Sequence, residues 1–174
     1  MSNGAYCSNN GILTQLDNGN NMDILKYKHG LIGRPGVVYC GRPKTNNWSH
    51  GQLLIGLGNP FSWKQTKLAK FKVKTLEESL SGYRRWLFKL LLAHKEQRLN
   101  RLEPWEVDYL EKTLELARSI NKGEVSALIC WCVNVNDYVP EKGKEKCHTQ
   151  ILYAACLWLI QEKNFKILPN QAPD

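Results

Sequence analysis

The sequence has no aspartate or glutamate between Ile24 and Leu76, so all sixteen of its carboxylates lie outside this segment. The segment is rich in cationic residues: Lys26, Lys28, Arg34, Arg42, Lys44, Lys64, Lys67, Lys70, Lys72 and Lys74. A long stretch of one charge sign creates a positive field that attracts phosphates. For any single lysine a solvated basic face is the simpler interpretation, but for the whole segment we expect an anionic partner.

Two further absences bear on location and on the cysteines. No apolar run is long enough to span a membrane, and the N-terminus lacks the apolar stretch of a signal peptide. We therefore expect no membrane association and a cytoplasmic protein, whose thiols stay reduced. Six cysteines in 174 residues are too few for a disulfide scaffold, which leaves metal binding, catalysis or packing to explain them.

The chain reads as one globular domain with short ends. Residues 1–23, rich in Asn, Gly and Ser, are expected to be a mobile arm, and 169–174 a tail. The domain between them, 24–168, has strand signals at 24–27, 37–40, 71–74 and 127–133. Helix signals follow at 75–90, where Thr75 and Glu78 form a capping box, at 104–122, and at about 147–162.

This alternation of strands and helices predicts an α/β fold. We expect a single two-layer or three-layer domain with a small, mainly parallel sheet, helices packed on it, and a Rossmann-like general layout. The continuous apolar run at 127–133 is typical of a buried central strand.

Four residues stand out near the end of that strand and the start of the last helix. Residues two apart in a strand share a face, so Cys130 and Cys132 should point the same way. Cys147 and His148 open the next helix. Ligand crevices form at the carboxyl ends of parallel strands, and we therefore expect the four side chains to converge.

Three interpretations of the four residues remain open. They line a ligand pocket in which His148 exchanges a proton, they bind zinc as a Cys₃His set, or the cysteines are core residues. We favour the pocket and expect no cofactor, because adjacent Cys147 and His148 would reach one ion only with strain. The helix start should lower the pKa of Cys147, so this thiol should alkylate fastest, whereas burial slows Cys130, Cys132 and Cys156.

Five short motifs occur in a fixed order: YCGRP, GNPF, YRRWL, CWC and CH. Together they resemble the family known as domain of unknown function 4326 over about Val37–Leu159. The resembling positions are Tyr39, Gly41, Arg42, Pro43, Gly58, Asn59, Pro60, Phe61, Tyr83, Arg84, Trp86, Leu87, Cys130, Trp131, Cys132, Cys147 and His148. The helix at about 103–122 looks like an insertion, and Thr149 replaces a usual glycine. The resemblance implies no reaction.

The motif residues have physical interpretations of their own. Gly41 lets backbone approach a ligand, and Arg42 can grip a phosphate or carboxylate with two N–H groups. Asn59 can read a base or sugar edge, so we expect its substitution to harm function more than stability. Phe61, like Trp48 or Trp63, can stack on a ring. Alternatively, Asn59 caps its own turn and Arg42 pairs with a surface carboxylate.

These residues lead to two functional hypotheses. The first is a protein that binds a nucleotide-like or other phosphorylated ligand and acts on it through Cys147 and His148. Arg42 and the helix start at Cys147 would hold the anion, with Gly41, Asn59, Phe61, Cys130 and Cys132 around it. The second is a nucleic-acid-binding module without catalysis, in which lysines 64–74 follow a backbone and Trp48 and Trp63 stack on bases.

Overall fold

The structure is a computed structural model that describes residues 22–28, 30–42, 56–64, 66–132 and 145–162. Its strands are β1 (Asp23–Lys26), β2 (Val37–Tyr39), β3 (Phe61–Ser62), β4 (Phe71–Lys72) and β5 (Ala127–Cys130). Its helices are α1 (Leu76–Lys95), the short 3₁₀ helix η1 (Leu99–Arg101), α2 (Pro104–Asn121) and α3 (His148–Gln161). The predicted arm and tail lie outside the described residues.

The main sheet has the order β1-β5-β2, and both pairs are parallel. Leu128 of β5 faces Ile24 on one side and Val38 on the other. All four residues of β5 are buried, as expected for a central strand. The α/β fold class is therefore confirmed, but β5 ends at Cys130, three residues earlier than predicted.

Strands β3 and β4 pair in parallel and form a second, two-stranded sheet, in which β3 contacts α1. The sequence predicts a strand at 71–74, and β4 confirms its first half. It does not predict β3, because Phe61–Ser62 is too short to show an alternating pattern.

The helices begin where the sequence predicts. The hydroxyl of Thr75 accepts the N–H of Glu78 at 3.1 Å, and the Glu78 carboxylate accepts the N–H of Lys74, one residue before the cap, at 2.7 Å. Pro104 is the first residue of α2, and Gly123 follows its end with a φ of +73°. These caps fix the helices that surround the sheet.

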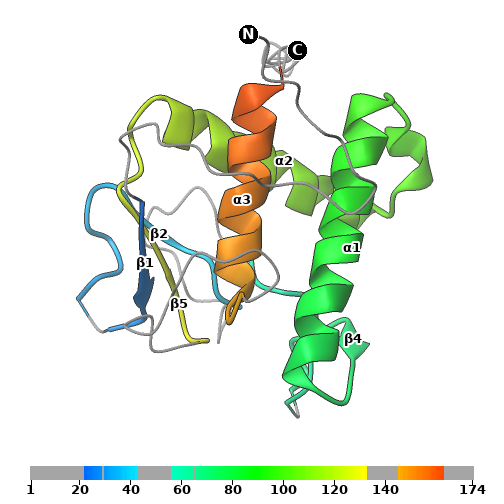
Figure 1. The fold of residues 1–174 in the computed structure, drawn as a ribbon, viewed down its shortest axis with the longest axis horizontal. Helices are drawn as coiled ribbons and strands as arrows, with labels where there is room; N and C mark the ends of the chain where they lie inside the picture. The colour runs from blue at the N-terminus through cyan, green and yellow to red at the C-terminus, as the bar shows by residue number, and fades with distance from the viewer. Residues whose placement is uncertain (1–21, 29, 43–55, 65, 133–144, 163–174) are drawn as a thin grey trace, which may run out of the picture.

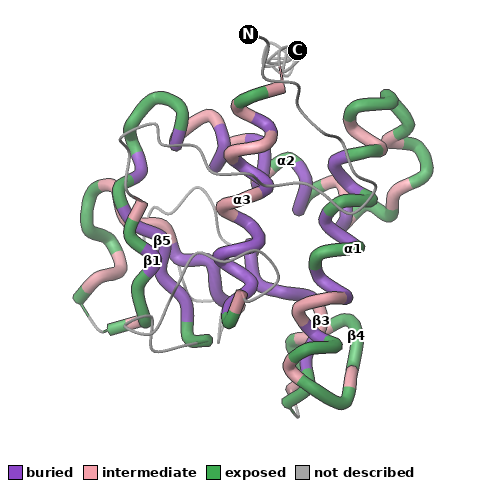
Figure 2. The backbone as a smooth tube through the Cα atoms, viewed as in Figure 1, coloured by how far each residue is buried: buried purple, intermediate pink, exposed green. Residues whose placement is uncertain are grey.

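The core forms where α3 packs between the sheet and α1, with α2 also against α3 (Figure 1). Leu116 of α2, Leu128 of β5 and Leu152 of α3 are fully buried in it. Figure 2 shows the same arrangement as buried segments along β5 and the facing sides of the helices. Helix α2, although it resembles an insertion, is thus part of the core. No described helix is long and apolar enough to cross a membrane.

Candidate functional site

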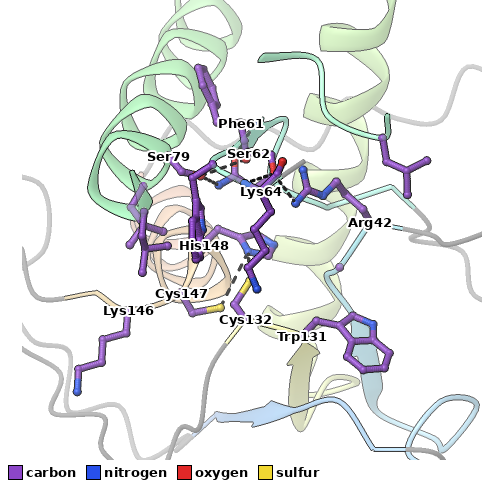
Figure 3. A pocket seen from close by; sticks show the side chains of 16 residues that line it. Arg42, Phe61, Ser62, Lys64, Ser79, Trp131, Cys132, Lys146, Cys147 and His148 are labelled. Carbon is purple, nitrogen blue, oxygen red and sulfur yellow. Dashed lines mark hydrogen bonds between the residues drawn. The ribbon is translucent and has the colours of Figure 1, made fainter. Parts of the chain in front are cut away.

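A pocket of about 250 Å³ lies between the end of β2, the segment 59–64, the start of α1, the end of β5 and the start of α3 (Figure 3). It is lined by every predicted site residue except Cys130: Gly41, Arg42, Asn59, Phe61, Cys132, Cys147 and His148. Cys130 is buried and touches the pocket residue Cys147 through its sulfur. The fold therefore brings all eight predicted residues to one place.

The three thiols and the histidine form a compact group, hereafter the Cys-His cluster (Cys130, Cys132, Cys147 and His148). Their four donor atoms all lie within 4.8 Å of one another. The sulfurs of Cys130 and Cys147 are 3.1 Å apart, and the Cys132 sulfur is 3.3 Å from Nδ1 of His148. The predicted convergence is thus observed, and the cluster can hold a metal ion.

The His148 ring is oriented by backbone outside the cluster. Its Nε2 lies 2.7 Å from the carbonyl oxygen of Cys40, which can only accept, so Nε2 carries a proton and donates it. The His148 and Tyr83 rings also form a T-shaped pair, with their centroids 5.6 Å apart. Nδ1 is consequently directed at the sulfurs.

The start of α3 is built as a capping box with a cysteine in the place usually taken by serine or threonine. Cys147 is the N-cap, and its sulfur accepts the N–H of Thr149 at 3.4 Å. The side-chain oxygen of Gln150 accepts the N–H of Cys147 at 3.0 Å. These two amides are bonded within the protein, and anion binding at this helix start stays a prediction.

The electrostatics favour a thiolate at Cys147. Hydrogen bonds from Cys130 and Cys132 lower the pKa of Cys147, and burial only partly opposes them. Burial disfavours the charged form of His148, but hydrogen bonds to Cys130 and Cys147 raise its pKa to about 10. Both shifts favour a thiolate at Cys147 and a protonated ring at His148 when no metal is bound.

The exposure of the thiols differs from the prediction. Cys132 was expected to be protected by burial, but it lies beyond the end of β5 and is exposed. Cys147, expected to react fastest, is only 3% exposed. Cys132 is exposed because the strand ends at Cys130 and the backbone bends before Cys132, whereas the order of alkylation stays a prediction.

Arg42 is the most unusual cation of the pocket. One terminal nitrogen, Nη2, is 3.4 Å from the Ser62 hydroxyl, while Nη1 is buried and has no hydrogen-bond partner in the part of the chain that the structure describes. Among the described residues no carboxylate lies within ion-pair distance of it, so the predicted alternative of a surface ion pair is not observed there. Burial lowers the pKa of this guanidinium, which reflects the cost of keeping its charge from water.

The other predicted ligand-binding residues have internal contacts. A methyl group on Gly41 would collide with the Tyr39 ring, so packing alone requires glycine there. The Asn59 oxygen accepts the N–H of Phe61 at 2.8 Å, and its nitrogen donates to Ser79 at 3.0 Å. The ring of Phe61 stacks on that of Phe71, with the two centroids 4.7 Å apart. Asn59 thus forms the self-capping turn that the sequence offered as the alternative.

Several residues that line the pocket were not predicted from the sequence to do so. Those with polar or aromatic side chains are Ser62, Lys64, Ser79, Trp131 and Lys146. Trp131 stacks on Tyr27 at 4.0 Å, and Trp48 lies outside the described residues. The spacing of Cys147 and Gln150 was a readable signal for the cap, whereas nothing local links Ser62 or Ser79 to Arg42 or Asn59.

Comparison with known proteins decides the family. The sequence profile of a domain of unknown function (DUF4326) matches residues 24–158. The chain belongs to this family. The match confirms the resemblance read from the motifs, and the structure shows why two motifs of this DUF4326 domain occur together. A methyl group on Gly58 would lie 2.7 Å from the backbone nitrogen of Arg42, so Gly58 of the GNPF segment packs directly against the backbone of Arg42. Neither the curated proteins nor the solved structures contain a match to the chain.

Proposed function

We propose that this DUF4326 protein binds a small anionic, nucleotide-like ligand in the pocket. The observation that carries the proposal is Arg42, whose buried Nη1 lacks a hydrogen-bond partner and whose charge lacks a carboxylate among the described residues. An unpartnered buried donor on a cation is costly. A bound phosphate or carboxylate would supply the missing acceptor in the two-pronged geometry that guanidinium groups favour.

The rest of the pocket wall fits the same ligand class. Lys64 and Lys146 line it together with Arg42, and no aspartate or glutamate is among its described lining residues. Trp63, which is 46% exposed, and Phe61 offer aromatic surface near these charges. A ligand with a phosphate at one end and a ring at the other combines both features.

Substitution of Arg42 tests the proposal. We expect Arg42→Ala to weaken binding of inorganic phosphate and of a nucleoside monophosphate at least about tenfold, roughly 1.4 kcal/mol. The melting temperature should change little, because the guanidinium makes few internal bonds. Arg42→Lys should recover part of the affinity, since it keeps charge but not the fork.

Calorimetric titration and thermal unfolding of the same samples give both readouts. Arg85→Ala is the matched control, because Arg85 is an exposed arginine of α1 and does not line the pocket. Unchanged binding with a large loss of thermal stability would show that Arg42 is structural and would overturn the proposal.

Nucleic-acid binding is the second candidate function. Lys64, Lys67, Lys70, Lys72 and Lys74 are all exposed. Such a row can follow a phosphate backbone while Trp63 stacks on a base.

A catalytic role for Cys147 and His148 depends on what the cluster binds. A thiolate beside an imidazolium can attack a substrate or transfer a proton. A thiolate and imidazole bound to a metal ion are not free to do so. We also propose a cytosolic location, because thiols stay reduced there.

A further inference from the structure

We infer that Cys130, Cys132, Cys147 and His148 bind one zinc ion, which ties the carboxyl end of β5 to the start of α3 and forms one wall of the pocket. Thiolates with a single imidazole are a donor set that zinc prefers in structural sites. This inference does not depend on the anionic ligand. The ligand was proposed from the unpartnered guanidinium of Arg42, and that argument uses none of the four residues.

The spacing of the donor atoms fits a tetrahedral ion. Zinc–sulfur bonds of about 2.3 Å and zinc–nitrogen bonds of about 2.0 Å place tetrahedral donors roughly 3.5–3.8 Å apart. The separations are 3.1 Å between Cys130 and Cys147, 3.3 Å between Cys132 and His148, and 4.0 Å between Cys147 and His148. These values bracket the tetrahedral edge, and no separation in the cluster exceeds 4.8 Å, so shifts of about an ångström suffice.

His148 makes the hydrogen bond that is typical of metal-bound histidines. Such residues donate the N–H of the nitrogen that does not bind the metal, commonly to a backbone carbonyl. Here Nε2 donates to the carbonyl of Cys40 at 2.7 Å. A histidine that binds a metal is neutral, so with its proton on Nε2 the lone pair lies on Nδ1, the nitrogen facing the sulfurs.

Backbone amides support the negative charge that ligating sulfurs carry. The N–H of Cys132 donates to the Cys130 sulfur at 3.0 Å, and the N–H of Thr149 donates to the Cys147 sulfur at 3.4 Å. Hydrogen bonds to a charged acceptor favour the charged form. The bend after β5 therefore serves two purposes, since it brings Cys132 to the cluster and directs its amide at Cys130.

The strain that argued against zinc in the sequence is absent. Cys147 is extended, with φ −144° and ψ 141°, while His148 is the first helical residue. The change of backbone conformation between them turns both side chains toward the same point.

The competing interpretations fit less well. A disulfide requires sulfurs about 2.05 Å apart, well below the separation of Cys130 and Cys147. Core packing accounts for Cys130 but not for Cys132, which is exposed and still directed at His148.

Metal analysis of the full chain is the first test. After expression with zinc and dialysis under reducing conditions, we expect about one zinc ion per chain. Cobalt substitution should give the visible absorption of a tetrahedral thiolate-bound ion. Cys132→Ala should lower metal retention at least about tenfold. Cys156→Ala is the matched control, because Cys156 is a fully buried cysteine outside the cluster.

Timed alkylation with peptide mapping is the second test, and it needs no variant that might fail to fold. Cys132 is exposed, so chelation should speed its alkylation at least about tenfold, and added zinc should restore protection. Chelation should not change phosphate binding through Arg42 unless the pocket wall loosens, so the two proposals fail separately. A chain that retains no zinc after reconstitution, alkylates at Cys132 equally with and without chelator, or forms a Cys130–Cys147 disulfide instead would overturn the inference.

Discussion

At the scale of the residue, Asn59 shows how one side chain joins two segments of the pocket. Its oxygen holds the N–H of Phe61 in β3, and its nitrogen holds the Ser79 hydroxyl, which in turn donates to the Phe61 carbonyl at 3.1 Å. These bonds close a ring between the GNPF segment and α1. Asn59 is only 7% exposed, so water has little access to these bonds.

We expect Asn59→Asp to cost about 1–3 kcal/mol of folding stability, in contrast to our expectation from sequence of a mainly functional loss. The aspartate can still accept from Phe61, but it loses the donor to Ser79 and adds a buried charge. Chemical denaturation measures the loss, and Asn100→Asp, at an exposed position of η1, is the control. Equal stability of the two variants, with ligand affinity lost only at position 59, would restore the functional interpretation.

Residue types were predictable here, whereas their partners were not. Arg42, Cys147 and His148 were identified from their chemistry and their positions after a strand or before a helix. The carbonyl of Cys40 that orients His148 is 108 residues away in the chain. No local pattern carries such a pairing, because it arises from the packing of β2 beside β5.

At the scale of the element, Glu106 connects α1 to the start of α2. Its carboxylate accepts the Trp86 indole N–H at 2.7 Å, the Lys89 ammonium at 3.1 Å and the backbone N–H of Glu103 at 3.1 Å. Burial opposes ionisation, but these bonds lower the pKa of Glu106. The carboxylate thus caps one helix and anchors the other.

Glu106→Gln should destabilise the fold by about 1.5–3 kcal/mol at neutral pH, because charge-assisted hydrogen bonds are lost. A carboxylate with a lowered pKa contributes fully above its unfolded pKa and loses that contribution as pH falls through the folded value. The difference between wild type and variant should therefore shrink below about pH 4.

Denaturation at several pH values measures this difference. Glu111→Gln, an exposed substitution in α2, is the control and should be neutral throughout. If the difference in unfolding free energy between wild type and Glu106→Gln stays constant down to pH 3, the charge of Glu106 is unimportant for stability.

Helices were easier to predict than strands for a physical reason. Thr75, Pro104 and Gly123 mark helix ends through local chemistry, so α1 and α2 could be placed within a few residues. Strands depend on neighbours that are distant in sequence: β3 has only two residues, and β5 ends early because the chain bends toward the cluster. The periodicity of apolar residues in the sequence shows neither the short β3 nor the early end of β5.

At the scale of the whole molecule, the net charge of +8 and the acid-free segment leave two partners to distinguish. Binding of a mononucleotide should weaken only modestly between 50 and 200 mM salt. A nucleic acid held by several lysines should lose about 10³–10⁵ in affinity over the same range.

Titration of a nucleoside monophosphate and of a single-stranded oligonucleotide at both salt concentrations decides between them. Replacing Lys67, Lys70 and Lys72 by glutamine should flatten the oligonucleotide slope and leave the mononucleotide affinity unchanged, since none of the three lines the pocket. Equal sensitivity of the two ligands to the triple substitution would argue against a separate pocket ligand.

The position of β5 in the sheet also sets the order in which the protein can be made. β1 and β2 emerge first from the ribosome, but each pairs with β5 in the main sheet. At about 5–20 residues per second, the wait between Tyr39 and Cys130 lasts roughly 5–20 s. During it both strands lack their partner, and Cys147 and His148 have yet to be synthesised. The first half of the domain is therefore open to chaperones or to misassembly until the last third arrives.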